Sequence, residues 1–290
     1  MTSEKPVGKS LCGIVLHPAG HTLSPVLHRA AYEQLRLDAE YFVFDIRPGA
    51  LGKVLDAMRT LNIKQLSVSL PHKMDAATLA DTSSHAVEEI GAANTLTLMP
   101  DGKIHADNTD WSGVLHALGK QKMNCESKAT IIGAGGAARA AAYALYMMGC
   151  KPITIVNRTN FRAADLAREF NQLFQCEKFR AGRVEEEYDV LVNTTPIGMK
   201  GEHEGESPVP KECLRPGTTI LDAVYNPLET RLYREARIQG CRAIDGLQWL
   251  AHQAAAQVHA WSGLLPDAAL MRQAAVKVLR PYPINPLHPS

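Results

Sequence analysis

A short apolar run that enters a glycine-rich turn and then an alanine-rich stretch constrains the fold of this chain more than any other feature. Residues 130–132 are β-branched or apolar and predict a buried parallel strand, and residues 137–148 predict the helix after it. Gly133, Gly135 and Ala138 match the spacing G-x-G-x-x-G/A, in which the glycines permit a tight turn and a close approach of the backbone to a pyrophosphate. The first turn of the helix would add unpaired N–H groups and a positive dipole end. The stretch therefore predicts a dinucleotide-binding βαβ unit.

The end of the next expected strand, at residues 152–156, indicates which dinucleotide is bound. An NAD-binding domain usually has an acidic residue there, which accepts hydrogen bonds from the ribose hydroxyls. This chain has Asn157, Arg158 and Thr159 instead, with Arg162 close by. Arginine suits a 2′-phosphate because its guanidinium group forms charge-assisted, bidentate hydrogen bonds, although a solvated arginine at a strand end is the alternative. The sequence predicts NADP as the cofactor, with NAD as the second choice.

Composition limits the class of protein. The chain has 290 residues, of which 46% are hydrophobic and 21% charged, as in a globular protein of one large or two ordinary domains. A net charge of +1 does not favour nucleic acid or an anionic membrane surface as partner. Six scattered cysteines without a CxxC pair fit reduced thiols, and no apolar stretch reaches the roughly 18 residues of a membrane span. We expect a cytoplasmic protein that binds a small molecule, as a monomer or homodimer.

Strands and helices alternate along the first part of the chain, which predicts an α/β fold with a parallel sheet. A hairpin over residues 94–105 would join this sheet, and residues 121–124 would cross to a second sheet with later strands at 189–193, 219–223 and 241–244. We expect four regions: an N-terminal α/β substrate-binding domain at 1–121, a Rossmann-type NADP-binding domain at 122–245, C-terminal helices at 246–280 that return to the first domain, and a disordered tail at 281–290.

Loops of the first domain carry polar residues that suit a small acid. Thr22 and Ser24 stand one residue apart, and in extended backbone such a pair points the same way and can hold a carboxylate, although Ser24 could equally cap the next helix. Lys73 follows Ser69 and His72 after a strand, at the sheet edge where ligands usually bind. In an alcohol–ketone interconversion this lysine could relay the hydroxyl proton. The alternatives are a surface lysine, or His72 as the proton carrier.

Two further polar residues follow in the same domain. Asn94 and Asp110 could hydrogen-bond substrate hydroxyls, and Asp110 could also pair with Lys73, although its position before a helix fits a cap. In the second half, Thr194 and Ala223 lie where two strands end, and could border a nicotinamide.

Other candidate positions carry less information. Gln253 lies one helical turn from Trp249 and from Gln257, which places two amides on one helix face, although such glutamines more often serve packing. His17, His21 and His28 resemble a metal set by count, but no carboxylate cluster joins them and a proline and a glycine interrupt the stretch. We expect no metal site.

Taken together, these stretches resemble the shikimate dehydrogenase family, collinearly over about residues 11–263. The motifs that carry the resemblance are the stretches 22–25, 69–73, 91–95, 108–110, 133–138, 157–159, 193–199 and 225–227, with Gly246 and Gln253. The resemblance implies an NADP-binding Rossmann domain beside a substrate domain, and reversible oxidation of shikimate to 3-dehydroshikimate. It implies that Lys73 and Asp110 form the catalytic pair.

The same resemblance implies the binding residues. Those expected to contact the substrate are Thr22, Ser24, Ser69, Asn94, Asp110, Tyr225 and Gln253. Those expected at the cofactor, from the glycine turn, the second strand and the resemblance together, are Gly133, Ala134, Gly135, Gly136, Ala137, Asn157, Arg158, Thr159, Arg162, Thr194, Ala223 and Gly246.

Several positions depart from the commonest family pattern. The family usually has serine at Thr22, asparagine at Ser67, threonine at Ser69 and methionine at Trp249. The serine at Ser69 is similar to the quinate/shikimate branch, so a quinate or related cyclitol-acid dehydrogenase is the first alternative function. A non-catalytic sensor of the acid is a second alternative, against which the presence of both Lys73 and Asp110 argues.

Overall fold

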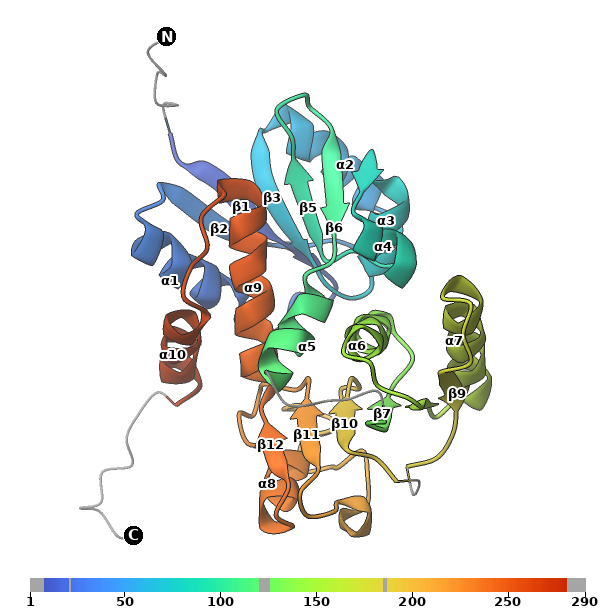
Figure 1. Cartoon of the computed structure of the whole chain (residues 1–290). Helices are drawn as coiled ribbons and strands as arrows, with labels where there is room; N and C mark the ends of the chain where they lie inside the picture. The colour runs from blue at the N-terminus through green and yellow to red at the C-terminus, as the bar shows by residue number, and fades with distance from the viewer. Residues whose placement is uncertain (1–7, 21, 120–125, 185–186, 281–290) are drawn as a thin grey trace, which may run out of the picture.

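Two six-stranded sheets with helices packed against them make up the described part of the chain in the computed structural model (Figure 1). The structure describes residues 8–20, 22–119, 126–184 and 187–280. The crossing expected at residues 121–124, His21 and the tail at 281–290 lie outside these ranges. The α/β fold class expected from the sequence is confirmed.

The first sheet is mixed and has the strand order β2-β1-β3-β5-β6-β4. Its strands are β1 (Ser10–Leu16), β2 (Ala39–Asp45), β3 (Ile63–Val68), β4 (Thr82–Ser83), β5 (Thr95–Leu98) and β6 (Ile104–Asp107). β1 pairs in parallel with β2 and β3, whereas β5 is antiparallel to both of its neighbours, as the predicted hairpin requires. The helices between them are α1 (Ser24–Leu35), α2 (Leu51–Thr60), α3 (Lys73–Leu79) and α4 (His85–Ile90).

The second sheet is parallel throughout the described residues and has the order β12-β11-β10-β7-β8-β9. Its strands are β7 (Ala129–Ile132), β8 (Ile153–Val156), β9 (Phe179–Ala181), β10 (Val190–Asn193), β11 (Thr219–Asp222) and β12 (Arg242–Ile244). The accompanying helices are α6 (Gly136–Met147), α7 (Asn160–Leu173), the 3-10 turn η1 (Lys211–Cys213) and α8 (Arg231–Ile238). Strand order reverses between β7 and β10, and such a switch point opens a crevice at the carboxyl ends of the strands.

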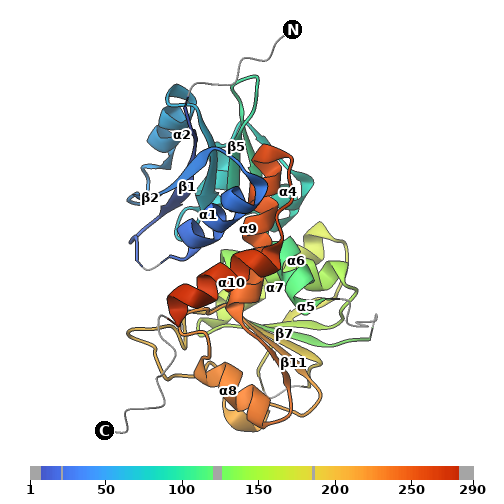
Figure 2. The same ribbon diagram turned by 90° about the vertical axis from the view of Figure 1, so that its left-hand side faces the viewer.

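Two neighbouring helices, α5 (Asp110–Leu118) and α9 (Gly246–Ser262), lie between the sheets (Figure 1). α9 contributes Trp249 to the core of the second sheet, and Leu247, Ala251 and Ala254 to a core it shares with α1. α10 (Ala268–Leu279) packs on α1 and α9 (Figure 2). The C-terminal helices therefore return to the first sheet. The domain boundaries given from the sequence stay predictions.

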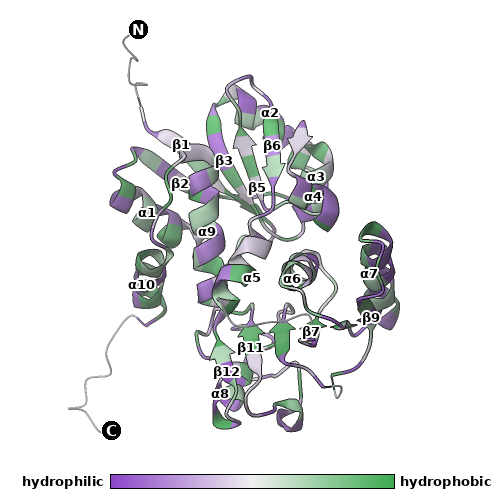
Figure 3. Cartoon of the chain, viewed as in Figure 1, coloured by the Kyte–Doolittle hydropathy of each residue, from purple (hydrophilic) through white to green (hydrophobic). Residues whose placement is uncertain are grey.

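Several elements were not expected from the sequence, namely α3, β4, α4, α7, β9, η1 and α8. α7 does carry a readable signal, because Ala163, Leu166, Ala167 and Phe170 are its buried residues, at the spacing of one helix face. In Figure 3, α7 carries both hydrophobic and hydrophilic colour, whereas α4 is mostly hydrophilic in colour. No helix in the described ranges is long and apolar enough to cross a bilayer.

Candidate active site

A cavity of about 410 Å³ lies where the carboxyl ends of both sheets meet α5 and α9. Every catalytic and substrate-binding residue expected from the sequence lines it: Thr22, Ser24, Ser69, Lys73, Asn94, Asp110, Tyr225 and Gln253. Most of the expected cofactor residues line it as well: Gly133, Ala134, Gly135, Gly136, Ala137, Asn157, Thr194, Ala223 and Gly246. The loops of two separate sheets therefore converge on one space.

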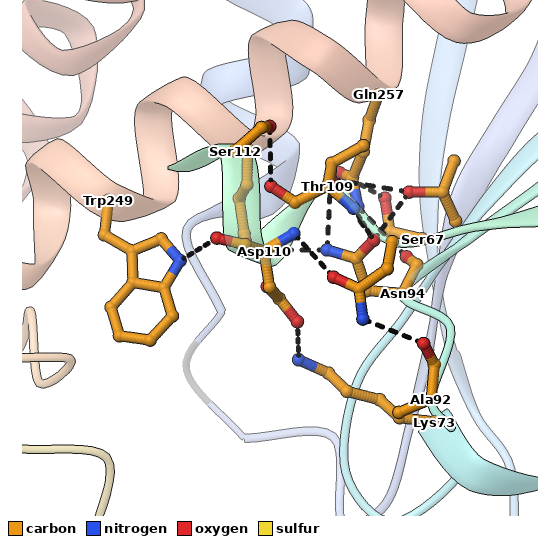
Figure 4. Close-up of polar contacts among 12 residues, drawn as sticks. Ser67, Lys73, Ala92, Asn94, Thr109, Asp110, Ser112, Trp249 and Gln257 are labelled. Atoms are coloured by element: carbon orange, nitrogen blue, oxygen red, sulfur yellow. Dashed lines mark hydrogen bonds and ion pairs between the residues drawn. The ribbon is translucent and has the colours of Figure 1, made fainter. Parts of the chain in front are cut away.

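Lys73 and Asp110 form an ion pair in this cavity (Figure 4). The Nζ of Lys73 donates to Oδ2 of Asp110 over 2.6 Å, and the two side chains are 14% and 4% exposed. Lys73 opens α3 and Asp110 opens α5, whose N-cap residue is Thr109, so Asp110 is not the cap that the sequence left open. The pair holds the amine at a defined position and shields it from most of the solvent.

The amide groups of the cavity are largely engaged with protein partners. Asn94 Oδ1 accepts from the backbone N–H of Thr109 over 2.7 Å, and its Nδ2 donates to Thr109 Oγ1 over 3.0 Å. A longer contact of 3.4 Å runs from Asn94 Nδ2 to Oε1 of Gln253, the bond that a ligand hydroxyl could replace most readily. Gln257, one turn further along α9, donates to the Asn94 carbonyl over 3.0 Å. Asn94 therefore aligns α5 and α9 around the cavity.

Ser67 lines the cavity, but its hydroxyl group is fully used by the protein. It donates to Oε1 of Gln257 over 2.9 Å and accepts from Tyr41 over 2.7 Å and from Gln65 over 3.1 Å. A hydroxyl offers one donor and two acceptor sites, so none remains for a ligand. His28 also contacts Gln257, and burial lowers the pKa of this histidine to about 3, which keeps it neutral.

The hydroxyl groups of Thr22 and Ser24 lie together, although not by the geometry that we expected. Leu23 between them is helical, with φ −91° and ψ −2°, so the segment is not extended. Ser24 is the first residue of α1 rather than its cap. Thr22 Oγ1 accepts from the backbone N–H of Ser24 and donates to its hydroxyl oxygen, both over 3.2 Å. Two hydroxyls and the start of a helix therefore face the cavity together.

The glycine turn after β7 has the form that an approaching phosphate requires. Gly133 has φ +117°, and a Cβ there would collide with the hydroxyl of Thr194, which donates to the Ile132 carbonyl over 2.6 Å. Gly135 is the N-cap of α6, and the position of its missing Cβ is open. Lys73 packs against Gly136, so the turn reaches the ion pair. The chain can thus hold a dinucleotide next to Lys73.

Comparison with known proteins agrees with this geometry. Residues 14–96 match the shikimate dehydrogenase substrate binding domain, and residues 117–197 match the family "Shikimate / quinate 5-dehydrogenase". A relative from Maridesulfovibrio salexigens, named shikimate dehydrogenase (NADP(+)), is 38% identical over 271 residues, which cover 93% of this chain and 98% of the relative. The chain belongs to the shikimate dehydrogenase family.

Solved structures of the shikimate dehydrogenase family have the same fold. The enzyme of Thermus thermophilus in complex with NADP(H) and shikimate is 35% identical, with a TM-score of 0.84 over 92% of this chain and 99% of that one. A quinate dehydrogenase from Corynebacterium glutamicum in complex with NAD is 28% identical, also with a TM-score of 0.84, over 93% of this chain and 99% of that one. The predicted family and the predicted class of enzyme, an oxidoreductase acting on a CH–OH group, are confirmed.

Three of the expected cofactor residues, Arg158, Thr159 and Arg162, do not line the cavity. Arg158 is exposed in the turn after β8, and Thr159 is the N-cap residue of α7. His72 does not line the cavity either, because its ring is buried with Nε2 2.7 Å from the Ile46 carbonyl. His72 is therefore wrongly placed to carry the substrate proton in a shikimate dehydrogenase-type reaction.

The sequence assigned no catalytic or binding role to the other lining residues. They are Ile14, Ser67, Val68, Leu70, Thr195, Pro196, Trp249, Leu250 and Gln257. For Trp249 and Gln257 a signal existed, because each is one turn from Gln253 on α9. Val68, Leu70 and Thr195 are adjacent in sequence to expected residues, which was the available signal for them.

Two loops at the cofactor side of the cavity are joined through Asp222, at the end of β11. Its carboxylate accepts from Asn193 Nδ2 over 2.8 Å, from the Val224 N–H over 3.0 Å and from Thr230 Oγ1 over 2.6 Å. These contacts hold the loops that carry Thr194 and Tyr225. Burial raises the pKa of Asp222 to about 6, against the hydrogen bonds, which lower it.

This buried carboxyl should leave a signature in the pH dependence of stability. Between the ordinary value of 3.8 and about 6, folded protein binds the Asp222 proton more tightly than unfolded protein, so this group destabilises the fold as pH rises through that window. From about pH 4 to about pH 7, the unfolding free energy of wild type should fall by about 2 kcal/mol relative to that of Asp222→Asn. Urea titrations across that range measure it. Parallel pH curves for the two proteins would contradict the shift.

Proposed function

We propose that this chain is an NADP-dependent shikimate dehydrogenase that interconverts shikimate and 3-dehydroshikimate. The observation that carries the proposal is the buried Lys73–Asp110 pair, which lies against the glycine turn after β7 in a cavity that also contains clustered hydroxyl groups. The name of the relative from Maridesulfovibrio salexigens and the shikimate in the Thermus thermophilus structure support the same substrate.

The substrate would be held by its carboxylate on one side and by its ring hydroxyls on the other. We assign its carboxylate to the hydroxyl groups of Thr22, Ser24 and Ser69, which line the cavity beside the start of α1. We assign its ring hydroxyls to Asn94, Asp110 and Gln253, with Tyr225 on the same cavity wall. Because Asn94 is already bonded to Thr109, its role would be mainly to orient Gln253 and α5.

Lys73 would relay the proton of the hydroxyl group that is oxidised. Its Nζ donates one hydrogen to Asp110. The other hydrogens of the ammonium group, or the lone pair of the neutral amine, remain available to the substrate oxygen. Asp110 would orient the amine and keep it from turning away from the cavity. When bound, NADP supplies the hydride chemistry.

The cofactor would lie along the glycine turn, with its phosphates at the start of α6 and its nicotinamide near Thr194, Ala223 and Gly246. The turn after β8 would take the adenosine side, where Asn157 lines the cavity and Arg158, Thr159 and Arg162 follow. NAD remains the alternative cofactor.

Quinate is the alternative substrate, and the NAD-bound quinate dehydrogenase with the same fold, together with Ser69, favours it. Ser69 lacks the methyl group of the threonine that the family usually has there, and one methyl group in a pocket changes binding by only about 1–3 kcal/mol, so few substitutions would be needed to move from one acid to the other. A non-catalytic sensor would hold NADP and acid without turnover.

Absorbance of the reduced nicotinamide tests these alternatives directly. Purified protein is assayed with shikimate and with quinate, each with NADP and with NAD. We expect the highest kcat/KM for shikimate with NADP. A higher kcat/KM for quinate would replace the substrate in the proposal, and cofactor binding without turnover of either acid would favour a sensor.

We also propose a reducing, cytoplasmic compartment, and a monomer or homodimer. The five cysteines in the described ranges are free thiols, which is the observation that supports the compartment.

A further inference from the structure

Trp249 contacts the backbone of Asp110 from the neighbouring helix (Figure 4). Its indole Nε1 donates to the carbonyl oxygen of Asp110 over 2.9 Å. The side chain is 4% exposed and lines the cavity. A single hydrogen bond thus joins α9 to the first residue of α5, whose carboxylate holds Lys73.

The indole ring is held in place by shape as well as by this bond. Gly113 is three residues after Asp110 in α5, and a Cβ there would lie 2.7 Å from Cδ1 of Trp249 and 3.0 Å from its carbonyl oxygen. Glycine inside a helix costs about 1 kcal/mol relative to alanine. Gly113, a poor helix former, therefore occupies the position in α5 where the indole ring of Trp249 leaves no room for a Cβ atom.

Asp110 is fixed from three sides. Its N–H donates to Oδ1 of Asn108 over 3.0 Å, its carboxylate accepts from Lys73, and its carbonyl accepts from Trp249. A rotation of this peptide would displace the carboxylate, and with it the amine that the carboxylate holds. Proton transfer is sensitive to such displacements, because misplacing a reacting group by about 1 Å can cost about a hundredfold in rate.

We propose that Trp249 is a positioning residue for the reaction, whose indole N–H fixes the peptide of Asp110 and so keeps the Lys73–Asp110 pair aligned with the substrate hydroxyl. This inference rests on the proposed function, because it requires Lys73 and Asp110 to handle the hydroxyl proton. Trp249 acts through Asp110 and need not touch the reacting atoms.

The test removes the N–H and keeps an aromatic ring. We expect Trp249→Phe to lower kcat by about five- to thirtyfold, the range expected for the loss of one hydrogen bond. The KM for the acid and the Kd for NADPH should stay within about twofold, because the hydroxyls of Thr22 and Ser24 and the glycine turn are unchanged. A substitution that only loosens packing would raise KM as well, so the separation of kcat from KM distinguishes the two roles.

Trp261→Phe is the matched control. Trp261 is on the same helix, and its Nε1 is buried without a hydrogen-bond partner in the described part of the chain. The chemical change is identical but removes no bond, so kcat should stay at the wild-type value. Gly113→Ala is the complementary variant, because it keeps the N–H and displaces the ring. It should lower kcat as Trp249→Phe does, in spite of the better helix propensity of alanine.

The outcomes separate the two hypotheses. Equal kcat in Trp249→Phe and Trp261→Phe, with turnover in the wild type, would overturn the role of Trp249 and leave the proposed function in place. A wild-type protein without turnover of shikimate or quinate would overturn the proposed function, and the role of Trp249 with it. A lower kcat at unchanged KM in Trp249→Phe alone supports the inference.

Discussion

Lys73→Ala is expected to lower kcat by about 10²–10⁴-fold, the contribution of general acid–base catalysis, and to change KM little. The lysine amine lies 2.6 Å from the Asp110 carboxylate in a mostly buried pair, and its side chain packs against the start of α6 at Gly136. It is therefore placed between the expected site of the substrate hydroxyl and the glycine turn that would hold the cofactor. KM should change little because the substrate carboxylate would be held elsewhere, by the hydroxyls of Thr22 and Ser24.

Steady-state kinetics with the preferred acid and cofactor, on protein whose melting temperature matches the wild type, gives both constants. Lys53→Ala is the matched control, since Lys53 is exposed on α2 and does not line the cavity. It should retain wild-type kcat. If Lys73→Ala kept more than about a tenth of wild-type kcat, another group would have to carry the proton.

The grouping of site residues within each sheet was predictable from the sequence because it follows from strand direction. In a parallel sheet the carboxyl ends of the strands meet at one edge, so Ser24 after β1 and Lys73 after β3 lie at one edge of the first sheet, and Thr194 after β10 lies beside the glycine turn after β7 in the second. The glycine spacing also predicted that a helix, α6, begins at this edge of the second sheet. Neither argument needs the orientation of any one side chain.

Side-chain direction was the part that the sequence did not determine. Lys73 and His72 are adjacent, yet the first faces the cavity and the second faces the Ile46 carbonyl. The sequence predicted that α1 begins at about Pro25, but it begins at Ser24. Leu23 is therefore the N-cap residue, and its backbone is helical rather than extended. Such details depend on where a helix begins, which shifts by one or two residues without changing the periodic pattern.

Contacts between segments far apart in the sequence could not be predicted from local sequence patterns either. The bond between Ser67 and Gln257 joins residues 190 apart, and that between His28 and Gln257 joins residues 229 apart. Their geometry follows from how α9 packs against α1, β3 and β5, and no spacing within one segment encodes it. The hydrogen bond between Trp249 and Asp110 has the same origin, which is why the sequence indicated only Gly246 and Gln253 as site residues on α9.

Arg158→Ala is expected to weaken NADP binding by about 10- to 100-fold and NAD binding by less than about threefold. The two cofactors differ only by the 2′-phosphate, so a loss confined to NADP assigns the arginine to that group. Arg158 is exposed in the turn after β8 and does not line the cavity around Lys73, as expected of a residue at the adenosine end of an extended dinucleotide. Bidentate hydrogen bonds from a guanidinium group to a phosphate contribute about 1.5–3 kcal/mol, which corresponds to a loss of this size.

Fluorescence titrations with NADPH and with NADH give the two dissociation constants without turnover, so this result does not depend on which acid is the substrate. Arg168→Ala is the matched control, because Arg168 lies on α7, the helix that follows the same turn, is exposed and pairs with Asp165. It removes one positive charge from the same region and should change both constants by less than about twofold, since exposed charges at a distance are screened by salt. Equal losses for NADPH and NADH in Arg158→Ala would mean that the arginine shapes the turn after β8 rather than binding the phosphate. NADP preference would then have to come from Arg162 or from Asn157, which is the residue of this turn that lines the cavity.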